Sequence, residues 1–393
     1  MTVPDPRPVG ASAQSASSEP GPGERAIFGD VPVTRRMMAE GPRRFAASIA
    51  GVGLALMLVL LLDGLSAGID ARITAYEEQS GASLFVAQPG ASSLLGSTSV
   101  LPKSTMDQVR ADPNVTWTAP MRGFFSVPEV GGTKIPSYVV GWQPGEHGGP
   151  WELAQGQAPT KVDEVAVGEQ FLRRGNLHVG DSLEVVGSRF RIVGVAKDAD
   201  MFMASFVFMT HEATDDLLHA PDTTSFLLVG SNRPEATKAN LAGQGLNVLT
   251  QEQIKQGDLA LKGQTFGTAL TAMVLLAAAV GTLVIALAIY SAITDRSRDY
   301  GIIKALGSTN SRLFRLAAAQ SVSLALVGFV VGVGFFAAGS ALLHATRPQF
   351  AIVVSTASLA RVLVVAVVMG LVATLVPARH LAAMEPAHAF KGA

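Results

Sequence analysis

The chain has 393 residues and a formal net charge of −1; 48% of its residues are hydrophobic and only 16% are charged. Soluble domains carry about 25% charged residues, so this composition points away from an ordinary soluble protein. The balanced charge gives no electrostatic sign of nucleic-acid binding, and the lack of cysteine excludes disulfides, thiol catalysis and thiolate metal sites.

The N-terminal region divides into two parts by composition. Residues 1–24 are rich in proline, glycine and serine and hold almost no large apolar side chain, which predicts a disordered tail. Residues 25–44 are basic with a few apolar residues. We expect a cytoplasmic juxtamembrane helix there, and a merely solvated basic flank explains the same composition equally well.

Four apolar segments satisfy the length rule for a membrane-spanning helix, about 20 residues. We place them at residues 45–69, 263–294, 313–344 and 357–377. The first follows 44 residues, whereas a cleaved signal peptide has a short charged leader, so an uncleaved anchor is the better reading. A segment at 295–312 then joins the second and third spans, and a short loop at 345–356 joins the third and fourth.

Flanking lysine and arginine residues predict the orientation of these spans. Six positive residues precede the first span and five lie in 295–315, against two around the connection between the third and fourth spans. The N-terminus, the 295–312 segment and the C-terminal tail at 378–393 are therefore expected in the cytoplasm. Residues 70–262 are expected on the outer side.

The outer segment, residues 70–262, carries a mixed α/β pattern with Gly180-Asp181 and Gly187-Ser188 as expected turns. Strands are expected within Ala82–Gly90 and in the stretches "SYVVGW", "DEVAVG", "DSLEVV", "FRIVGVAKD" and "SFVFMT". Helices are expected at Lys103–Ala111, Glu169–Arg174, Glu212–His219 and Arg233–Lys262. The last helix should continue into the second span as one rod. The expected fold is an α-helical membrane protein with four transmembrane helices and one large extracytoplasmic mixed α/β domain between helices 1 and 2.

Two motifs for nucleotide binding and hydrolysis are absent from the sequence: it contains no GxxxxGK[ST] and no HExxH. The neighbouring carboxylates Glu77/Glu78 and Asp163/Glu164 should point in different directions, so we expect solvated surface charge rather than acid–base chemistry. The chain is not expected to be an enzyme or to hold a cofactor or metal of its own.

A compact charged segment, "DRSRDYGIIKALG", follows the second apolar run. Three apolar residues can share one helical face beside three basic residues, and a glycine is placed to end the helix. These are Ile302, Ile303 and Leu306, then Arg296, Arg298 and Lys304, and Gly307. The segment is either an ordinary positively charged cytoplasmic loop or a docking element for a cytoplasmic motor.

This segment resembles the corresponding stretch of MacB/FtsX-type ABC transporter permeases. The matching residues are Arg296, Arg298, Gly301, Ile302, Lys304, Ala305, Leu306 and Gly307, with Asp299 in place of glutamate. The tail "PARHLAAMEPAHAFK" is similar to that family's C-terminal motif. It matches at Pro377, Ala378, Arg379, Ala382, Pro386 and Ala389, with Glu385 in place of aspartate, and departs from it at His380, Ala383 and His388. After the first span, "GASLFVAQPGASSLLGSTSVLP" looks most like the HrtB/DevC branch.

The resemblance implies a permease in a bacterial cell membrane that works with a separate cytoplasmic ATPase dimer, which binds ATP and Mg. It implies a homodimer of this chain, contact with membrane lipid, and ATPase coupling through the segment that includes Ile303. Motor closure would be transmitted through long helices to move a hydrophobic or amphiphilic compound outward, with haem, lipid or drug as options. The alternative is an FtsX-like scaffold that transmits ATPase cycles to an extracellular partner such as a cell-wall hydrolase and transports nothing.

Three residues in or near the spans are candidates for substrate contact, because polar or soft side chains in a membrane are often functional. Asp63 should lie near the outer interface, where wetting by lipid headgroups is the simpler explanation. Met57 and Met273 could ligate haem iron or line a soft hydrophobic groove, and packing is the simpler explanation for both. The Met-rich stretch Met201–Met209 reads as β core or as a greasy surface. Two small-residue pairs, Gly328/Gly332 and Gly51/Ala55, should allow close helix contact.

Overall fold

The computed structural model describes residues 42–201, 204–295, 309–346, 352–377 and 379. Two compact units divide the chain, residues 1–48 and residues 49–393. Of the first unit, the described part is the beginning of helix α2. Several expectations lie outside the described residues: the tail at 1–24, nearly all of the 25–44 helix, and the segment from 296 to 308.

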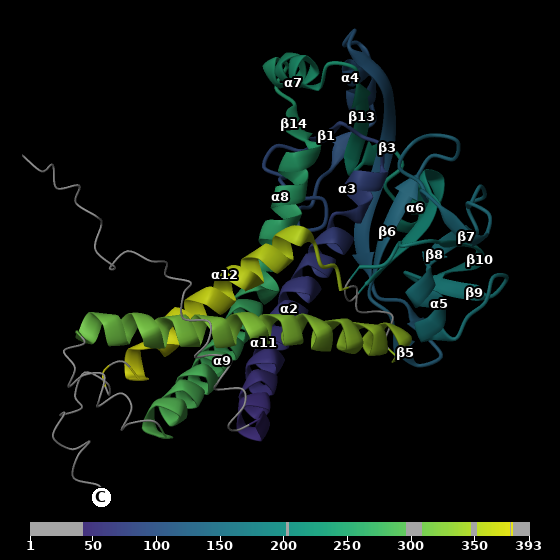
Figure 1. The fold of residues 1–393 in the computed structure, drawn as a ribbon. Coiled ribbons are helices and arrows are strands. Elements are labelled where there is room, and N and C mark those ends of the chain that lie inside the picture. Colours follow the sequence, from purple (N-terminus) through teal and green to yellow (C-terminus); the bar gives the residue numbers. More distant parts are fainter. Residues whose placement is uncertain (1–41, 202–203, 296–308, 347–351, 378, 380–393) are drawn as a thin grey trace, which may run out of the picture. The chain divides into compact units, whose positions relative to one another are not determined.

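Four long apolar helices carry the membrane-spanning segments, which confirms the predicted fold class (Figure 1). They are α2 (Pro42–Ile73), α9 (Thr268–Asp295), α11 (Asn310–Thr346) and α12 (Thr356–Ala373). The stretches long and apolar enough to cross a membrane are Ala46–Ile73, Thr268–Asp295, Asn310–Leu343 and Thr356–Pro377. A mixed α/β domain lies between α2 and α9 in the chain.

Glycines let the apolar helices pack closely. At Gly53 of α2, an added Cβ would lie 3.3 Å from both the Gly328 carbonyl oxygen and the Gly332 amide nitrogen of α11. At Gly281 of α9, an added Cβ would lie 2.8 Å from the Cβ of Ala55. The small residues noted in the sequence therefore lie at these crossings, where backbones approach with no room for a side chain.

The α/β domain is built on a ten-stranded sheet with the order β14-β1-β13-β3-β6-β11-β8-β10-β7, to which β9 adds by pairing with β10. Its strands are β1 (Leu84–Ala87), β3 (Val115–Ser126), β6 (Ser137–Trp142), β7 (Leu153–Gly156), β8 (Glu164–Gly168), β9 (Ser182–Val185), β10 (Ser188–Ala196), β11 (Ser205–Thr210), β13 (Phe226–Ser231) and β14 (Asn247–Thr250). The pairs β6–β11 and β8–β10 are parallel and the others are antiparallel. Two short ribbons join β2 (Leu101–Pro102) to β12 (Thr223–Thr224) and β4 (Glu129–Val130) to β5 (Thr133–Lys134).

Short helices pack around this sheet: α3 (Ala75–Gln79), α4 (Ser104–Arg110), α5 (Glu169–Gly175), α6 (His211–Leu218), α7 (Pro234–Gly243) and α8 (Gln251–Lys262). Every residue of β6, β8 and β11 is buried, as expected for continuous apolar strands covered on both faces. The described members of the Met-rich stretch Met201–Met209 belong to this region, and Met201, Phe206, Phe208 and Met209 are buried. These side chains belong to the hydrophobic core of the sheet, so the prediction of an exposed apolar surface is wrong for them.

Two local predictions are wrong. The stretch Arg233–Lys262 is not one helix: α7 ends at Gly243, Asn247–Thr250 forms edge strand β14 against β1, and α8 starts again at Gln251. A capping box at Thr250 and Gln253 explains that restart. The second β-turn is Val186-Gly187, one residue earlier than expected; both residues have positive φ, as a two-residue hairpin turn requires.

A continuous helical path leaves the α/β domain. Helix α8 passes directly into a π-helical turn, η1 (Gly263–Gly267), and then into α9 (Figure 1). The three elements have 12, 5 and 28 residues. At about 1.5 Å per residue, this helix is about 67 Å long. One continuous helical element therefore connects the β14 edge of the sheet to the far end of the second apolar helix.

Candidate functional site

The residues of the two sequence motifs fall largely outside the described chain. The expected ATPase-coupling residues Arg296, Arg298, Asp299, Gly301, Ile302, Ile303, Lys304, Leu306 and Gly307 all do so, as do Glu385 and Pro386. Pro377 is buried at the end of the fourth apolar segment, and Arg379 is exposed. Helices α9 and α11 end and begin on either side of the coupling segment, at Asp295 and Asn310.

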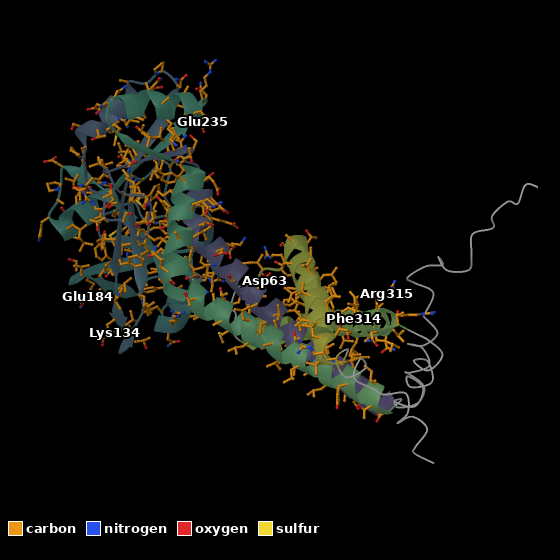
Figure 2. All side chains as sticks on the ribbon, turned by 90° about the vertical axis from the view of Figure 1, so that its left-hand side faces the viewer. Asp63, Lys134, Glu184, Glu235, Phe314 and Arg315 are labelled. Carbon is orange, nitrogen blue, oxygen red and sulfur yellow. The ribbon has the colours of Figure 1, made fainter. Side chains whose placement is uncertain are left out.

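The three substrate candidates are not brought together into one site. Asp63, which is labelled in Figure 2, accepts hydrogen bonds from Arg361 of α12 at 3.0 and 3.1 Å. An ion pair therefore joins the first and fourth apolar helices. Met57 reaches Gly339 of α11, and Met273 is 54% exposed on α9. In the described part of the chain no group of three or more histidine, aspartate or glutamate side chains could hold a metal ion.

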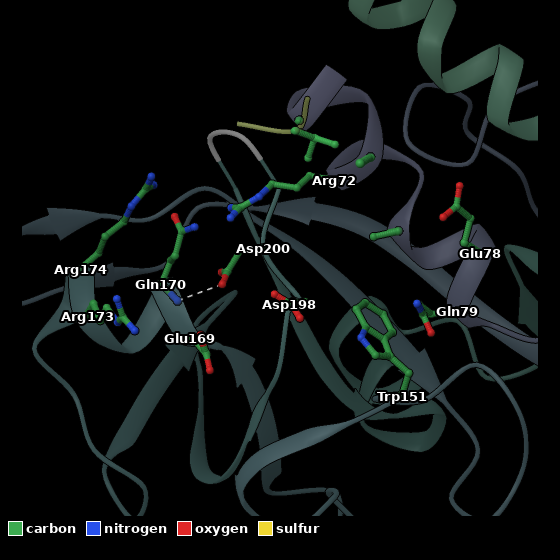
Figure 3. A pocket seen from close by; sticks show the side chains of 14 residues that line it. Arg72, Glu78, Gln79, Trp151, Glu169, Gln170, Arg173, Arg174, Asp198 and Asp200 are labelled. Atoms are coloured by element: carbon green, nitrogen blue, oxygen red, sulfur yellow. Dashed lines mark hydrogen bonds between the residues drawn. The ribbon is translucent and has the colours of Figure 1, made fainter. Parts of the chain in front are cut away.

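A cavity of about 420 Å³ lies where α2 and α3 meet the α/β domain (Figure 3). Five of the residues that line it are small or apolar: Gly68, Ala71, Ala75, Trp151 and Val353. The other residues that line it are polar or charged: Arg72, Glu78, Gln79, Glu169, Gln170, Arg173, Arg174, Asp198 and Asp200. The lining thus combines apolar and charged groups, a combination that suits an amphiphilic molecule.

Buried charges shape the centre of this cavity. Asp200 accepts hydrogen bonds from the Gln170 amide at 3.0 Å and from the Ser205 hydroxyl, and burial raises its pKa above the ordinary value. The Arg72 guanidinium points toward Asp198 and Asp200 (Figure 3). Within the described structure, its Nη1 atom is buried and has no hydrogen-bond partner.

A row of contacts fastens α8 to the end of α2 and to α3. Lys262 forms an ion pair with Asp70, and Lys255 forms one with Glu78 at 2.6 Å. The Gln251 side chain donates to the Glu77 carbonyl oxygen at 2.6 Å. Four residues on one face of α8, at helical spacing, make this row: Gln251, Lys255, Asp258 and Lys262.

Two carboxyl groups meet in the middle of this row. Glu77 is fully buried on α3, and the side chain of Asp258 on α8 lies against it. Burial, followed by the hydrogen bond and charge of Asp258, raises the pKa of Glu77 well above its ordinary value. Asp258 accepts from the backbone amides of Leu94 and Leu95 at 3.0 and 2.9 Å. The reading of Glu77 as a solvated surface charge is therefore wrong.

The same prediction is wrong for Glu164. Its side chain is 1% exposed, and it accepts from the Thr160 amide at 3.1 Å and from Arg191 at 2.9 Å. The Thr160 amide is the main cause that lowers the pKa of Glu164. Asp163 and Glu78 are not buried, so in each acidic pair one carboxylate faces the interior and the other does not. Adjacent side chains leave a helix or a strand in different directions, which predicts such a split but does not predict the partners.

Comparisons of the sequence with known proteins point to ABC transporter permeases. A family model described as MacB-like periplasmic core domain matches residues 45–252, and one described as FtsX-like permease C-terminal matches residues 271–386. The protein named Uncharacterized ABC transporter permease Rv0072, from Mycobacterium tuberculosis, is 28% identical over 367 residues, which are 91% of this chain and 98% of that protein. Macrolide export ATP-binding/permease protein MacB of Pectobacterium atrosepticum is 28% identical over 99 residues, 25% of this chain and 15% of that protein. The crystal structure of the periplasmic region of MacB from Actinobacillus actinomycetemcomitans is similar with a TM-score of 0.34 and 12% identity, over 45% of this chain and 94% of that one.

Proposed function

Because the chain belongs to the family of ABC transporter permeases with a MacB-like periplasmic core domain and an FtsX-like C-terminal region, we propose that it drives outward movement of an amphiphilic compound. Such a permease works with an ATP-binding subunit. In this proposal that subunit is a separate cytoplasmic ATPase dimer, two copies of this chain pair in a bacterial cell membrane, and the α/β domain faces outward. Haem, lipids and drugs all belong to the proposed substrate class.

The observation that carries this proposal is the continuous helix from Gln251 to Asp295. Its last residue adjoins the coupling segment, and its first adjoins edge strand β14. A movement imposed at Asp295 by closure of the ATPase would therefore reach the α/β domain without passing through a loop. This arrangement supports mechanotransmission, in which ATP hydrolysis on one side of the membrane moves the domain on the other.

The cavity beside Arg72 supports an amphiphilic substrate. It lies next to the end of α2, where the apolar helix gives way to charged residues, so a molecule partly in the lipid headgroup layer could reach it. The apolar lining residues Ala71, Ala75 and Val353 would contact the apolar part of the compound. The charged lining residues, Arg72 among them, would bind an oxygen of its polar head.

Reconstitution tests the proposal. The chain and its ATP-binding subunit would be placed together in lipid vesicles, and ATP hydrolysis and movement of labelled amphiphiles would be measured. The exporter is supported by ATP hydrolysis that an amphiphile stimulates, together with ATP-dependent movement of that compound. ATP hydrolysis that responds only to an extracellular protein, with no compound moved, would instead establish the scaffold function.

A further inference from the structure

The buried carboxyl pair on the helices that leave the membrane segments has no role in the proposed transport function. Glu77 and Asp258 lie in the row of contacts between α3 and α8, flanked by Lys255–Glu78 and Lys262–Asp70. Those flanking pairs join opposite charges. The central pair joins two acidic residues that are both almost completely buried. Two ionised carboxylates side by side in the protein interior would repel each other at a large cost in free energy.

The hydrogen bonds of the pair show which carboxyl holds the proton. Both oxygens of Asp258 accept from backbone N–H groups, those of Leu94 and Leu95, and such bonds favour an ionised carboxylate. Neither oxygen of Glu77 accepts a hydrogen bond from any donor in the described structure. A protonated Glu77 that donates to the Asp258 carboxylate leaves one negative charge and satisfies the contact.

Other titratable groups around the pair cannot neutralise it. Tyr76 and Tyr138 face it from α3 and β6, but their hydroxyls donate to the carbonyl oxygens of Gly148 and Leu94 at 2.9 and 2.8 Å. The two remaining neighbours, Glu78 and Lys255, pair with each other. The proton is therefore the component that makes this junction electrostatically possible.

We propose that Glu77 and Asp258 form a one-proton latch, in which the shared proton holds α3, the extension of the first apolar helix, against α8, the start of the continuous helix. Separation of α8 from α3 would admit water to Glu77, and Glu77 would release its proton. When the two helices come together again, Glu77 would take up a proton. A movement along the helix from Gln251 to Asp295 is thereby linked to proton binding at a site away from the nucleotide.

The sign of the pH dependence follows. Glu77 holds its proton in the latched form but loses it above about pH 4.3 when hydrated. Protonation thus stabilises the latched form fully below that pH, and this stabilisation falls as pH rises toward the raised pKa of Glu77. Each pH unit in this window should change the ratio of latched to open forms about tenfold.

The test uses the full chain purified in detergent, with the variants Glu77→Gln and Asp258→Asn and the control Glu78→Gln. Glutamine at position 77 is neutral and can donate a hydrogen bond to Asp258. The Glu77→Gln variant should therefore be at least as stable as the wild type at pH 8, and its melting temperature should rise relative to that of the wild type as pH increases from 5 to 8. Asp258→Asn should lower the melting temperature at every pH, since it turns one acceptor for the Leu94 and Leu95 amides into a donor. Glu78→Gln should leave the pH dependence unchanged.

Infrared spectroscopy gives a second readout. The wild type at pH 7 should show the C=O stretch of a protonated carboxyl, and Glu77→Gln should lose that band. The latch is overturned if the band is missing from the wild type, or if Glu77→Gln destabilises the chain as much as Asp258→Asn does. A fall in melting temperature on adding a chelator would also overturn it, because a shared cation would then occupy the pair.

Discussion

Asp63 of α2 and Arg361 of α12 face each other at 3.0 Å, so this acidic residue of the first apolar helix has its partner on the fourth apolar helix. The two residues are 298 positions apart in the chain. Arg361 is more exposed than Asp63, with 61% and 23% of their side chains accessible. The pair gives the Asp63 carboxylate an oppositely charged partner within a hydrophobic span.

We expect the Asp63–Arg361 pair to contribute modestly to stability. A double-mutant cycle with Asp63→Asn and Arg361→Gln should give a coupling free energy of about 0.2–1 kcal/mol, because the site is partly exposed. Thermal unfolding of the four proteins in detergent provides the measurement. A coupling indistinguishable from zero would show that the pair does not hold α2 to α12.

The close crossing of α2 and α11 should be sensitive to a single methyl group. At Gly332, an added Cβ would lie 2.8 Å from the Gly53 carbonyl oxygen, whereas at Gly334 it would meet nothing within 4 Å. Gly332→Ala should therefore cost about 1–3 kcal/mol of unfolding free energy. The matched control Gly334→Ala should be neutral or stabilising, because alanine favours helix over glycine. Equal melting temperatures for the two variants would contradict this packing.

The buried carboxylate Glu164 should stabilise the α/β domain in a pH-dependent way. Because its pKa is lowered in the fold, its contribution is present above the ordinary glutamate pKa of about 4.3 and is lost as pH falls below that value. Glu164→Gln should cost about 1–3 kcal/mol at pH 7, since it removes the negative charge that strengthens the hydrogen bonds from Arg191 and the Thr160 amide. The exposed neighbour gives the control: Asp163→Asn should change stability by less than about 0.5 kcal/mol. A Glu164→Gln defect that persists unchanged at pH 3 would count against this role.

The cavity at the end of α2 should govern the response to amphiphiles. Arg72→Gln removes a charge-assisted donor, and a loss of this kind costs about 1.5–3 kcal/mol, or roughly tenfold or more in apparent affinity. We expect the concentration of amphiphile that half-stimulates ATP hydrolysis to rise by that factor. Arg189→Gln, at an exposed position on β10, is the control and should respond like the wild type. The same response from both variants would remove the cavity from the transport path.

The coupling segment remains a prediction from the sequence. Ile302→Asp should leave the permease folded but sharply weaken association with the ATP-binding subunit, since losing one buried anchor commonly costs about 2 kcal/mol or more. A substitution of His344, near the other end of α11, should not. Co-purification of the two subunits measures the effect, and undiminished association of Ile302→Asp would reduce the segment to an ordinary charged loop.

Local patterns predicted much of the fold. The apolar runs and the strands "SYVVGW" and "SFVFMT" are set by hydrophobicity over neighbouring residues, so the sequence alone locates them. Strand β14 escaped prediction because it has four residues, two of them polar, and forms only by pairing with β1 across the chain. The strand propensity of individual residues does not predict a pairing that depends on the tertiary fold.

The candidate sites were less predictable for a related reason. The roles of Glu77 and Asp63 depend on Asp258 and Arg361, which approach them only in the folded chain. The adjacent acids Glu77 and Glu78 look alike in sequence, and it is the packing of α8 that buries one and pairs the other with Lys255. One signal was available: residues 251, 255, 258 and 262 share a helical face and carry polar groups suited to a partner helix.

The most direct test of the transmission of motion is to break the continuous helix from Gln251 to Asp295 at Gly263, where α8 meets the π-helical turn η1. Gly263 is exposed, and an added Cβ there would meet nothing within 4 Å, so Gly263→Ala should be tolerated. Gly263→Pro removes a backbone donor and disrupts the helix at a cost of about 3 kcal/mol. In vesicles containing the permease and its ATP-binding subunit, ATP-driven amphiphile movement would be measured beside ATP hydrolysis. We predict that Gly263→Pro still assembles and hydrolyses ATP but moves no amphiphile, while Gly263→Ala transports normally; transport at the wild-type rate by Gly263→Pro would contradict the account.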